Sequence, residues 1–378
     1  MKKIFFIVFF LYLTLFFLPA FAEETTPLIN EKTLIALAEQ GQAEAQFNLG
    51  MFYQSHQQFD QALHWYLLSA NQGFTKAQIN LGLMYQQGTG VELDEKQMLH
   101  WMKIAAESGD PIGQMNMAEY TLYGINDLLE KNPEEAERWL KKAAEQHFQP
   151  AMLTLAYWYE EGKAITKAPQ KAQKIYLALA EENHPQALYL LGYQAAVGMY
   201  DKVNYPLAFQ YFTRAAELGF SPAQNSLGML YLTGQGTKKD IQSAIKWLTL
   251  AAEQGEASAQ FNVALIYARG DGIKADQAKA CHWFIKAAQQ NSADAQYAAG
   301  ACYQYGMGVE ADDKKALRWY QLAAAKGHER AEKKVFNFKK PAAIDSIFPT
   351  YCCTTDISKI QKICIVYNQC RASIDIYY

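Results

Sequence analysis

The residues with the clearest chemical potential are a serine–lysine pair and three histidines. Ser243 and Lys246 match Ser-x-x-Lys, the motif that carries the nucleophile of β-lactamases and penicillin-binding proteins. That chemistry also requires Ser-Asp-Asn and Lys-Thr-Gly partners, and the sequence contains neither tripeptide. His64, His100 and His282 are 36 or more residues apart, whereas zinc ligands cluster at short spacings. We therefore expect no catalytic residue, no metal site and no cofactor.

Six cysteines raise a second kind of chemistry, the formation of disulfide bonds. Cys281 and Cys302 stand at positions that are usually apolar elsewhere in the chain, so we interpret them as buried free thiols. The other four lie near the C-terminus and include an adjacent pair that would be strained if joined to each other, so each is expected to pair with a more distant cysteine. The connectivity stays open, and the four residues are Cys352, Cys353, Cys364 and Cys370.

Residues 1–22 have the three parts of a secretory signal peptide. Lysines at positions 2 and 3 precede an almost unbroken apolar run over residues 4–18, and Ala20, Phe21 and Ala22 form a small-x-small cleavage site. An uncleaved membrane anchor is the alternative, but the run is shorter than the roughly 20 apolar residues that a spanning helix needs. We predict cleavage after Ala22 and a periplasmic or secreted mature chain without a membrane span.

The charge pattern argues against nucleic acid as a partner. The chain of 378 residues has 35 Lys and Arg against 38 Asp and Glu, a formal net charge of −3, and the two signs are mixed throughout. No basic stripe is present that could follow a phosphate backbone. A chain of this length would form about two globular domains, unless it is built from repeats that pack only on their neighbours.

The chain is in fact organised by a repeat, most copies of which begin with Ala-Gln. Successive copies are 36 residues apart over most of the chain, with a first copy four residues shorter and a third copy two residues longer. A fixed period of this size indicates a solenoid of stacked structural units. The eight copies begin at Ala45, Ala77, Gly113, Ala151, Ala187, Ala223, Ala259 and Ala295, and a partial ninth begins at Ala331.

Each copy predicts two helices, named helix A and helix B. With the first residue of the copy as position 1, helix A has apolar residues at positions 1, 5 and 9, which lie on one face of a helix. A glycine at position 6 allows another helix to approach closely, and a Gly-x-Gly turn ends helix A. Helix B often follows an Asp suited to N-capping and carries a tryptophan. In the second copy these residues are Ala77, Leu81, Gly82, Asp94 and Trp101.

The repeat register accounts for the apparent catalytic residues. The position of Ser243 holds Gln, Glu or Lys in other copies, and the position of the three histidines holds residues such as Arg138 and Arg318. A position that accepts such different polar residues is a solvated face. Six of the seven tryptophans share one position, which favours a role in the core over one in stacking on a ligand.

These motifs resemble those of a known family. Ala-Gln-x-x-Leu-Gly-x-x-Tyr, Gly-x-Gly and Lys-Ala-x-x-Trp-Tyr, best seen at residues 315–320, resemble the Sel-one-like repeat, a relative of the tetratricopeptide repeat. The resemblance covers roughly residues 37–335, and the third to fifth copies depart from it, with Ile175 and Tyr211 at the tryptophan position. It implies an all-α fold, a right-handed α/α superhelical solenoid of about eight helix-turn-helix repeats.

The resemblance also implies a function. The family serves as a non-enzymatic scaffold for protein interactions, and many exported bacterial members act in envelope regulation or in contact with a host. A cell-wall or β-lactam hydrolase is the alternative, because some cysteine-rich relatives are described as β-lactamases, but their repeated cysteine pairs are absent here. The expected organisation is a signal peptide at 1–22, a linker at 23–36, the solenoid at 37–336 and a cysteine-containing tail or cap at 337–378.

The partner-binding residues are predicted on helix A, which lines the concave face of such solenoids. Its third and seventh positions form an apolar, aromatic-rich stripe of the kind that binds a peptide or a helix, unless the stripe packs between neighbouring A helices. We expect a monomer with a protein or peptide partner, and we expect Tyr193→Ala or Phe261→Ala to weaken binding without lowering the melting temperature. The candidates are Phe47, Met51, Ile79, Leu83, Met115, Tyr157, Tyr189, Tyr193, Met229, Phe261 and Tyr297.

Overall fold

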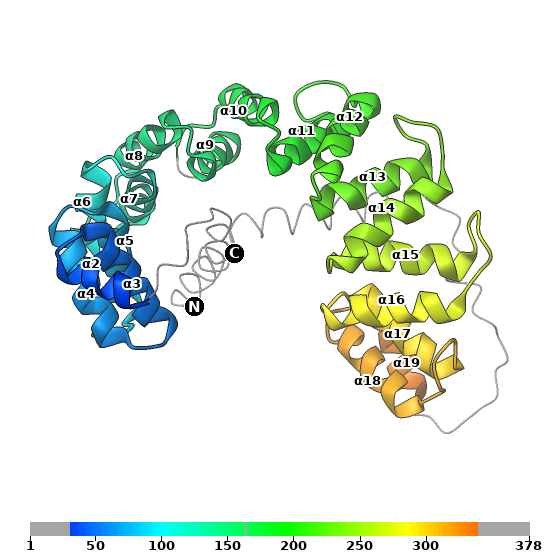
Figure 1. The fold of residues 1–378 in the computed structure, drawn as a ribbon. Helices are drawn as coiled ribbons and strands as arrows, with labels where there is room; N and C mark the ends of the chain where they lie inside the picture. Colours follow the sequence, from blue (N-terminus) through cyan, green and yellow to red (C-terminus); the bar gives the residue numbers. More distant parts are fainter. Residues whose placement is uncertain (1–30, 163–164, 339–378) are drawn as a thin grey trace. The chain divides into compact units, whose positions relative to one another are not determined.

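The described part of the chain in the computed structural model, residues 31–162 and 165–338, folds into 18 helices joined by short loops, with no strand. Helices α3 to α17 with odd numbers are the A helices of the eight copies, and helices α4 to α18 with even numbers are the B helices (Figure 1). This arrangement confirms the predicted all-α solenoid of helix pairs. The helices are α2 (Glu31–Glu39), α3 (Ala43–Ser55), α4 (Phe59–Asn71), α5 (Thr75–Gln87), α6 (Glu95–Glu107), α7 (Pro111–Tyr123), α8 (Pro133–Glu145), α9 (Gln149–Glu161), α10 (Pro169–Glu181), α11 (Pro185–Val197), α12 (Tyr205–Glu217), α13 (Ser221–Thr233), α14 (Ile241–Glu253), α15 (Ala257–Arg269), α16 (Gln277–Gln289), α17 (Ala293–Tyr305), α18 (Asp313–Ala324) and α19 (Glu329–Phe338).

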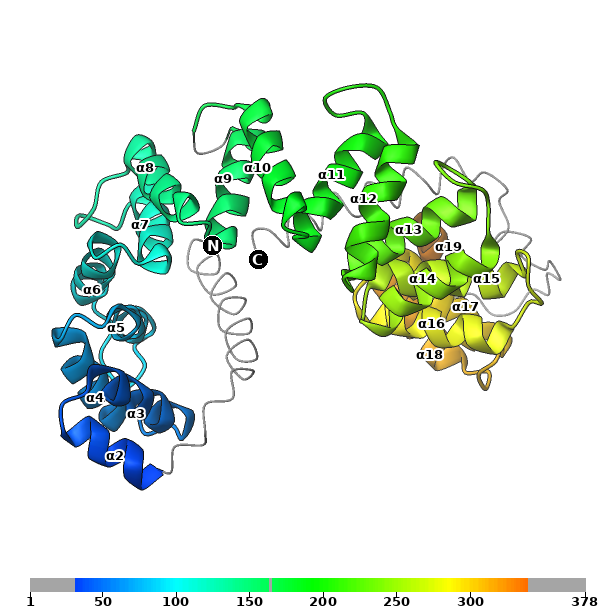
Figure 2. The same ribbon diagram turned by 45° about the horizontal axis from the view of Figure 1, so that its top comes forward.

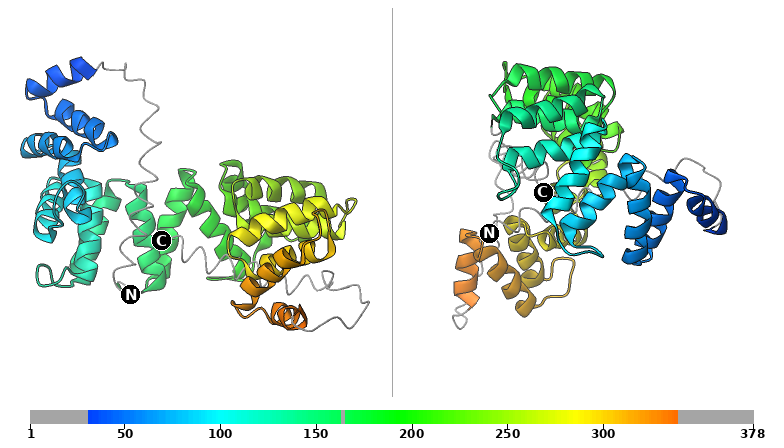
Figure 3. Two further views of the ribbon diagram at one scale, coloured as in Figure 1. Left: turned by 90° about the horizontal axis from the view of Figure 1, so that it is seen from below. Right: turned by 90° about the vertical axis from the view of Figure 1, so that its left-hand side faces the viewer.

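The chain divides into two compact units, one of which ends at Leu179 while the other begins at Ala180. Their described residues, 31–162 with 165–179 and 180–338, are named the N-terminal unit and the C-terminal unit. In the N-terminal unit α5, α7 and α9 follow one another on one side, and α6 and α8 on the other (Figure 1, Figure 2). In the C-terminal unit α13 to α18 stack in chain order, as two further views show (Figure 3).

The helix ends follow the predicted signals. Asp94 Oδ1 accepts hydrogen bonds from the backbone N–H groups of Lys96 at 2.9 Å and Gln97 at 3.0 Å, which gives two unpartnered donors of the first turn an acceptor. Asp240, Asp276 and Asp312 cap their B helices in the same way. These caps fix where α6, α14, α16 and α18 begin.

Two glycine positions set how closely the helices approach. At position 6, a Cβ atom on Gly50 would lie 2.6 Å from the ring of Tyr66 in helix B of the same copy. At the second glycine of the turn, a Cβ atom on Gly236 would lie 2.2 Å from the carbonyl oxygen of Tyr205 in the preceding copy, and the φ of Gly236 is +70°. The first glycine therefore fixes the spacing within a copy and the second the spacing between copies.

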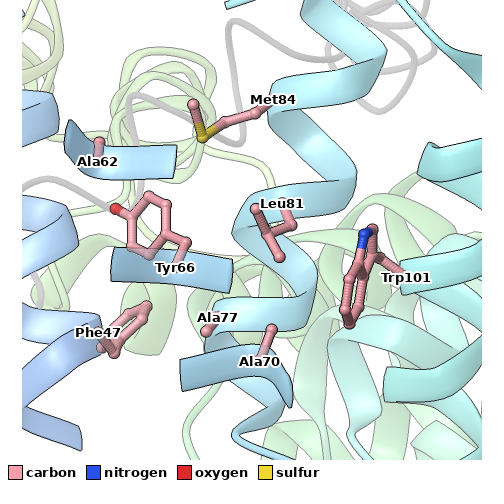
Figure 4. Close-up of a cluster of buried hydrophobic side chains, with 8 residues drawn as sticks. All are labelled: Phe47, Ala62, Tyr66, Ala70, Ala77, Leu81, Met84 and Trp101. Carbon is pink, nitrogen blue, oxygen red and sulfur yellow. The ribbon is translucent and has the colours of Figure 1, made fainter. Parts of the chain in front are cut away.

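The core runs through consecutive copies and is not confined to each one. One cluster joins Phe47 of α3, Tyr66 of α4, Leu81 of α5 and Trp101 of α6 (Figure 4). Trp101 is 8% exposed. The other tryptophans at this position are half-buried, and Trp65, Trp139, Trp283 and Trp319 pack against buried clusters, so the position contributes to the core as predicted. Each copy is stabilised by burying its apolar face on the next.

A glutamine at position 2 of helix A binds the end of the preceding helix B. Gln224 Nε2 donates to the carbonyl oxygen of Ala216 at 3.2 Å, and Gln260 Nε2 donates to that of Ala252 at 3.0 Å. The last carbonyl groups of a helix have no partner within the helix, so each glutamine supplies a donor that the backbone lacks. The same contact is made by Gln46, Gln78, Gln114 and Gln296.

A second glutamine, just after helix B, completes this contact in four copies. Gln254 Nε2 donates to Gln224 Oε1 at 2.8 Å, and the equivalent pairs are Gln72 with Gln46, Gln146 with Gln114 and Gln290 with Gln260. The second and eighth copies have Ser108 and Lys326 at this place. In these copies Gln78 Oε1 and Gln296 Oε1 are buried and accept no hydrogen bond from the described residues.

Cys281 of α16 and Cys302 of α17 form a disulfide bond, with Cα atoms 5.8 Å apart. The prediction of two free thiols is therefore wrong. Both cysteines are buried in one cluster where helix B of the seventh copy packs on helix A of the eighth, so two positions that are apolar in other copies face each other. The bond covalently joins two neighbouring copies.

The ends of the solenoid extend slightly beyond the predicted limits. Helix α2 begins at Glu31, inside the predicted linker 23–36, because Leu34, Ile35 and Leu37 pack on the apolar side of the first copy. Helix α19 extends the partial ninth copy to Phe338. Residues 1–30 and 339–378, with the predicted signal peptide and the four tail cysteines, lie outside the described residues. None of the described helices has the length and apolar character to cross a membrane.

Candidate partner-binding surface

The third position of helix A faces the core. The ring of Phe47, which is 8% exposed, has its centroid 5.8 Å from that of Tyr66 and 5.2 Å from that of Phe74, just before the next helix A. Similar ring contacts join Tyr189 to Phe212 and Phe220, Phe261 to Phe284, and Tyr297 to Tyr320 and His328. These aromatic side chains at the third position therefore pack on helix B of their own copy.

The predicted residues at this position differ only in how far they are buried. Phe47, Ile79 and Tyr189 are buried, whereas Met115, Phe261 and Tyr297 are half-buried. Because Phe261 packs on Phe284, we now expect Phe261→Ala to lower the melting temperature, contrary to the expectation from the sequence.

The seventh position is more open. Met51 is 42% exposed, and Leu83, Tyr193 and Met229 are half-buried, whereas Tyr157 is buried at 5% exposure. Met51 and Leu83 lie on successive A helices of the N-terminal unit, and Tyr193 and Met229 on successive A helices of the C-terminal unit. Four of the predicted residues thus leave part of their side chains open within their units.

Positions 4, 7 and 11 share one face of helix A, because residues three and four apart are neighbours on a helix surface. This surface is named the helix-A face. In the first three copies its fourth position carries half-buried asparagines, Asn48, Asn80 and Asn116. Asn225, at a third position, is instead buried and accepts a hydrogen bond from Asn262 Nδ2 at 3.0 Å.

Glu119 is a residue of the helix-A face that the sequence-based candidates omit. It occupies the seventh position of the third copy, on α7, where other copies have mainly apolar residues. The surrounding protein desolvates its carboxyl group and raises its pKa to about 7. The sequence signal that could have identified Glu119 is the presence of an acid at a repeat position that is mainly apolar in the other copies.

The serine, lysine and histidine side chains that suggested catalysis make local helix contacts or lie on the exposed surface. The Ser243 hydroxyl donates to Asp240 Oδ2 at 2.7 Å, at the start of α14, and the Lys246 ammonium lies 5.2 Å from the ring centroid of Trp247. His64, His100 and His282 are exposed. In residues 31–162 and 165–338 no three His, Cys, Asp or Glu side chains gather into a group that could hold a metal ion.

Comparison with protein families matches the whole array of helix pairs. The model described as "Sel1 repeat" matches eight consecutive segments, residues 43–74, 75–110, 111–148, 149–184, 185–220, 221–256, 257–292 and 293–328. The chain belongs to the Sel1 repeat family. Each Sel1 repeat segment contains one A helix and the B helix that follows it. A Sel1 repeat solenoid is a scaffold for protein interactions.

Two solved structures of Sel1 repeat proteins are similar to this chain. The first is c5321, a protective antigen present in uropathogenic Escherichia coli strains, which is 29% identical over 82% of this chain and 68% of its own, with a TM-score of 0.65. The second is a Sel1 repeat protein from Oxalobacter formigenes, which is 28% identical over 82% of this chain and 90% of its own, with a TM-score of 0.68.

A curated relative matches over a shorter stretch. The chitin synthase regulator SKT5 of Saccharomyces cerevisiae is 33% identical over 70 residues, which are 18% of this chain. The match spans 10% of the length of the yeast protein, so it concerns only a small part of that regulator.

Proposed function

We propose that this chain is an exported scaffold that binds a protein or peptide along its helix-A face. The observation that carries the proposal is the half-open seventh position, at which Met51, Leu83, Tyr193 and Met229 keep part of their side chains exposed in A helices that are otherwise mostly buried. Apolar side chains held open along successive helices form the kind of surface on which a partner docks.

Export to the cell envelope or beyond is supported by the disulfide between Cys281 and Cys302. Disulfide bonds form and persist in oxidising compartments and are rare in the cytosol. Similarity to c5321, a protective antigen, supports a role at the bacterial surface or in contact with a host. This export agrees with the signal peptide predicted at residues 1–22.

The binding proposal is tested with paired variants on the two layers of helices. Met51→Ser changes the helix-A face, and Leu68→Ser changes a residue of similar exposure on helix B, 38% against 42%. Immobilised protein is incubated with envelope extract and the captured proteins are quantified by mass spectrometry. We expect Met51→Ser, combined with Leu83→Ser, to lower capture of one protein about tenfold, while Leu68→Ser retains it and all variants keep the melting temperature. Loss with Leu68→Ser alone would contradict the proposal.

Export is tested on the chain recovered from the cell envelope or the culture medium. After alkylation of free thiols, mass spectrometry should find Cys281 linked to Cys302 and an N-terminus at Glu23. A chain that is found only in the cytosol, with residues 1–22 attached and both thiols alkylated, would refute export and leave the binding proposal in place.

A further inference from the structure

The helix-A layer of the N-terminal unit has a one-sided charge. At positions 1 to 11 of α3, α5, α7 and α9 there are three carboxylates, Glu119, Glu160 and Glu161, and no lysine, arginine or histidine. The remaining side chains of these positions are neutral. Over these positions a partner therefore meets only negative fixed charge, and the one basic residue of these four helices, Lys76, lies just before position 1 of α5.

Glu119 is the carboxylate with an unused capacity for binding. It forms no hydrogen bond or ion pair with the residues that the structure describes, whereas Glu160 accepts a hydrogen bond from the Tyr176 hydroxyl at 3.1 Å. The hydroxyl of the adjacent Tyr120 donates its hydrogen bond to Gln86 Oε1 at 3.1 Å and not to Glu119. The Glu119 side chain is half-buried, and partial desolvation of an unpaired carboxylate is unfavourable, so the protein keeps a costly group at this place.

The free energy of unfolding falls when Glu119 becomes charged. Burial raises its pKa to about 7, above the ordinary value of about 4.3. Because the folded chain holds the Glu119 proton more tightly than the unfolded chain does, the protonated carboxyl group stabilises the folded state. This contribution is complete below the ordinary pKa and is lost as the pH rises through about 7. Above that pH the folded chain holds a partly desolvated negative charge, which a cation placed next to it would neutralise.

We infer that the helix-A face of the N-terminal unit binds a protein segment carrying a lysine or arginine, whose charged group pairs with Glu119. The inference rests on the proposed function and gives the partner its chemistry. Leu83, at the seventh position of the preceding A helix, offers apolar surface for the alkyl stem of such a side chain. An ion pair in a desolvated place contributes more than one at an open surface.

The test uses peptides selected from a phage-displayed random library on the full exported chain. Their affinities are measured by fluorescence anisotropy for the wild type, Glu119→Gln and the exposed control Glu107→Gln on α6. We expect the selected peptides to contain Lys or Arg. Replacing that residue by Gln should weaken binding about tenfold to the wild type and to Glu107→Gln, and scarcely at all to Glu119→Gln. Glu119→Gln should fold normally, since it removes a partly desolvated charge.

The outcomes separate this inference from the proposed function. Peptides that lose affinity with Met51→Ser and Leu83→Ser but need no basic residue, or that bind Glu119→Gln as they bind the wild type, overturn the inference alone. Peptides that ignore Met51→Ser and Leu83→Ser overturn both ideas. A library that yields no binder likewise overturns both for peptide partners.

Discussion

The fifth and sixth copies are neighbours in the C-terminal unit and solve the same packing problem with different residues. The sixth has glutamines at positions Gln224 and Gln254 that bond to each other, whereas the fifth has Leu188 and Leu218 at the equivalent places. The carbonyl oxygen of Ala180, which a glutamine would otherwise bind, accepts a hydrogen bond from Arg214 Nη2 at 2.7 Å. In these two copies the contacting residues differ together, whereas the second and eighth copies keep only the first glutamine and leave its Oε1 atom buried without a donor among the described residues.

The turns of the two copies differ for the same reason. The sixth has Gly236 at the second turn glycine, pressed against the backbone of Tyr205, while the fifth has Tyr200, which is 37% exposed. A side chain can stand in the fifth copy because the backbone at Tyr200 does not take the positive φ of Gly236. The second turn position is thus constrained by a backbone contact in the sixth copy and not in the fifth.

The largest expected effect tests this contrast in the turns. Gly236→Ala forces alanine into a left-handed conformation, at about 1–2 kcal/mol, and presses its Cβ atom on Tyr205, at about 1–3 kcal/mol. We expect the free energy of unfolding to fall by about 3 kcal/mol, measured by urea denaturation. Tyr200→Ala should change it by less than about 0.5 kcal/mol. Equal losses from both variants would show that the two turns are constrained alike.

A smaller effect tests the coupling of the glutamines. In the second copy Gln78 Oε1 is buried without a donor, and Ser108 occupies the place of the second glutamine. Ser108→Gln should supply the donor and raise the free energy of unfolding by about 1 kcal/mol. Leu218→Gln is the matched control, because Leu188 offers no acceptor in that copy, and it should bring no gain. A gain of equal size in both variants would mean that helix propensity, and not the hydrogen bond, is responsible.

Local features of this fold could be predicted from the sequence because each depends on a few adjacent residues. The caps at Asp94 and Asp240, the left-handed turn at Gly88 and the close approach at Gly50 follow from residue type and repeat position. The core role of the tryptophans followed from their recurrence at one place. Such signals need no knowledge of which side of a helix meets the next copy.

Features that depend on packing between copies were not predictable in this way. The link between Cys281 and Cys302 requires that two apolar positions of different copies face each other. The third and seventh positions share a stripe in the sequence, and only the placement of the next helix buries Phe47 while it leaves Met51 exposed. Glu119 was not predicted because it is an acid at a position that is mainly apolar in the other copies. A residue that departs from the repeat at an open position can make partner recognition differ between copies.

The smallest expected effect concerns the cap that begins helix A of the fifth copy. His184 Nδ1 accepts a hydrogen bond from the backbone N–H of Ala187 at 3.4 Å, so the cap requires the neutral imidazole. Burial lowers the pKa of His184, with a smaller opposing effect from Glu182. Since the unfolded chain binds the proton more readily, the contribution to stability is complete above about pH 6.5 and is lost as the pH falls through the lowered pKa. His184→Asn keeps a cap that does not titrate, so the loss on acidification, below about 1 kcal/mol, should disappear from urea unfolding curves. His64→Asn, on the exposed surface of helix B, should leave the acid dependence as it is in the wild type, and an identical change in both variants would show that the cap of α11 is not its source.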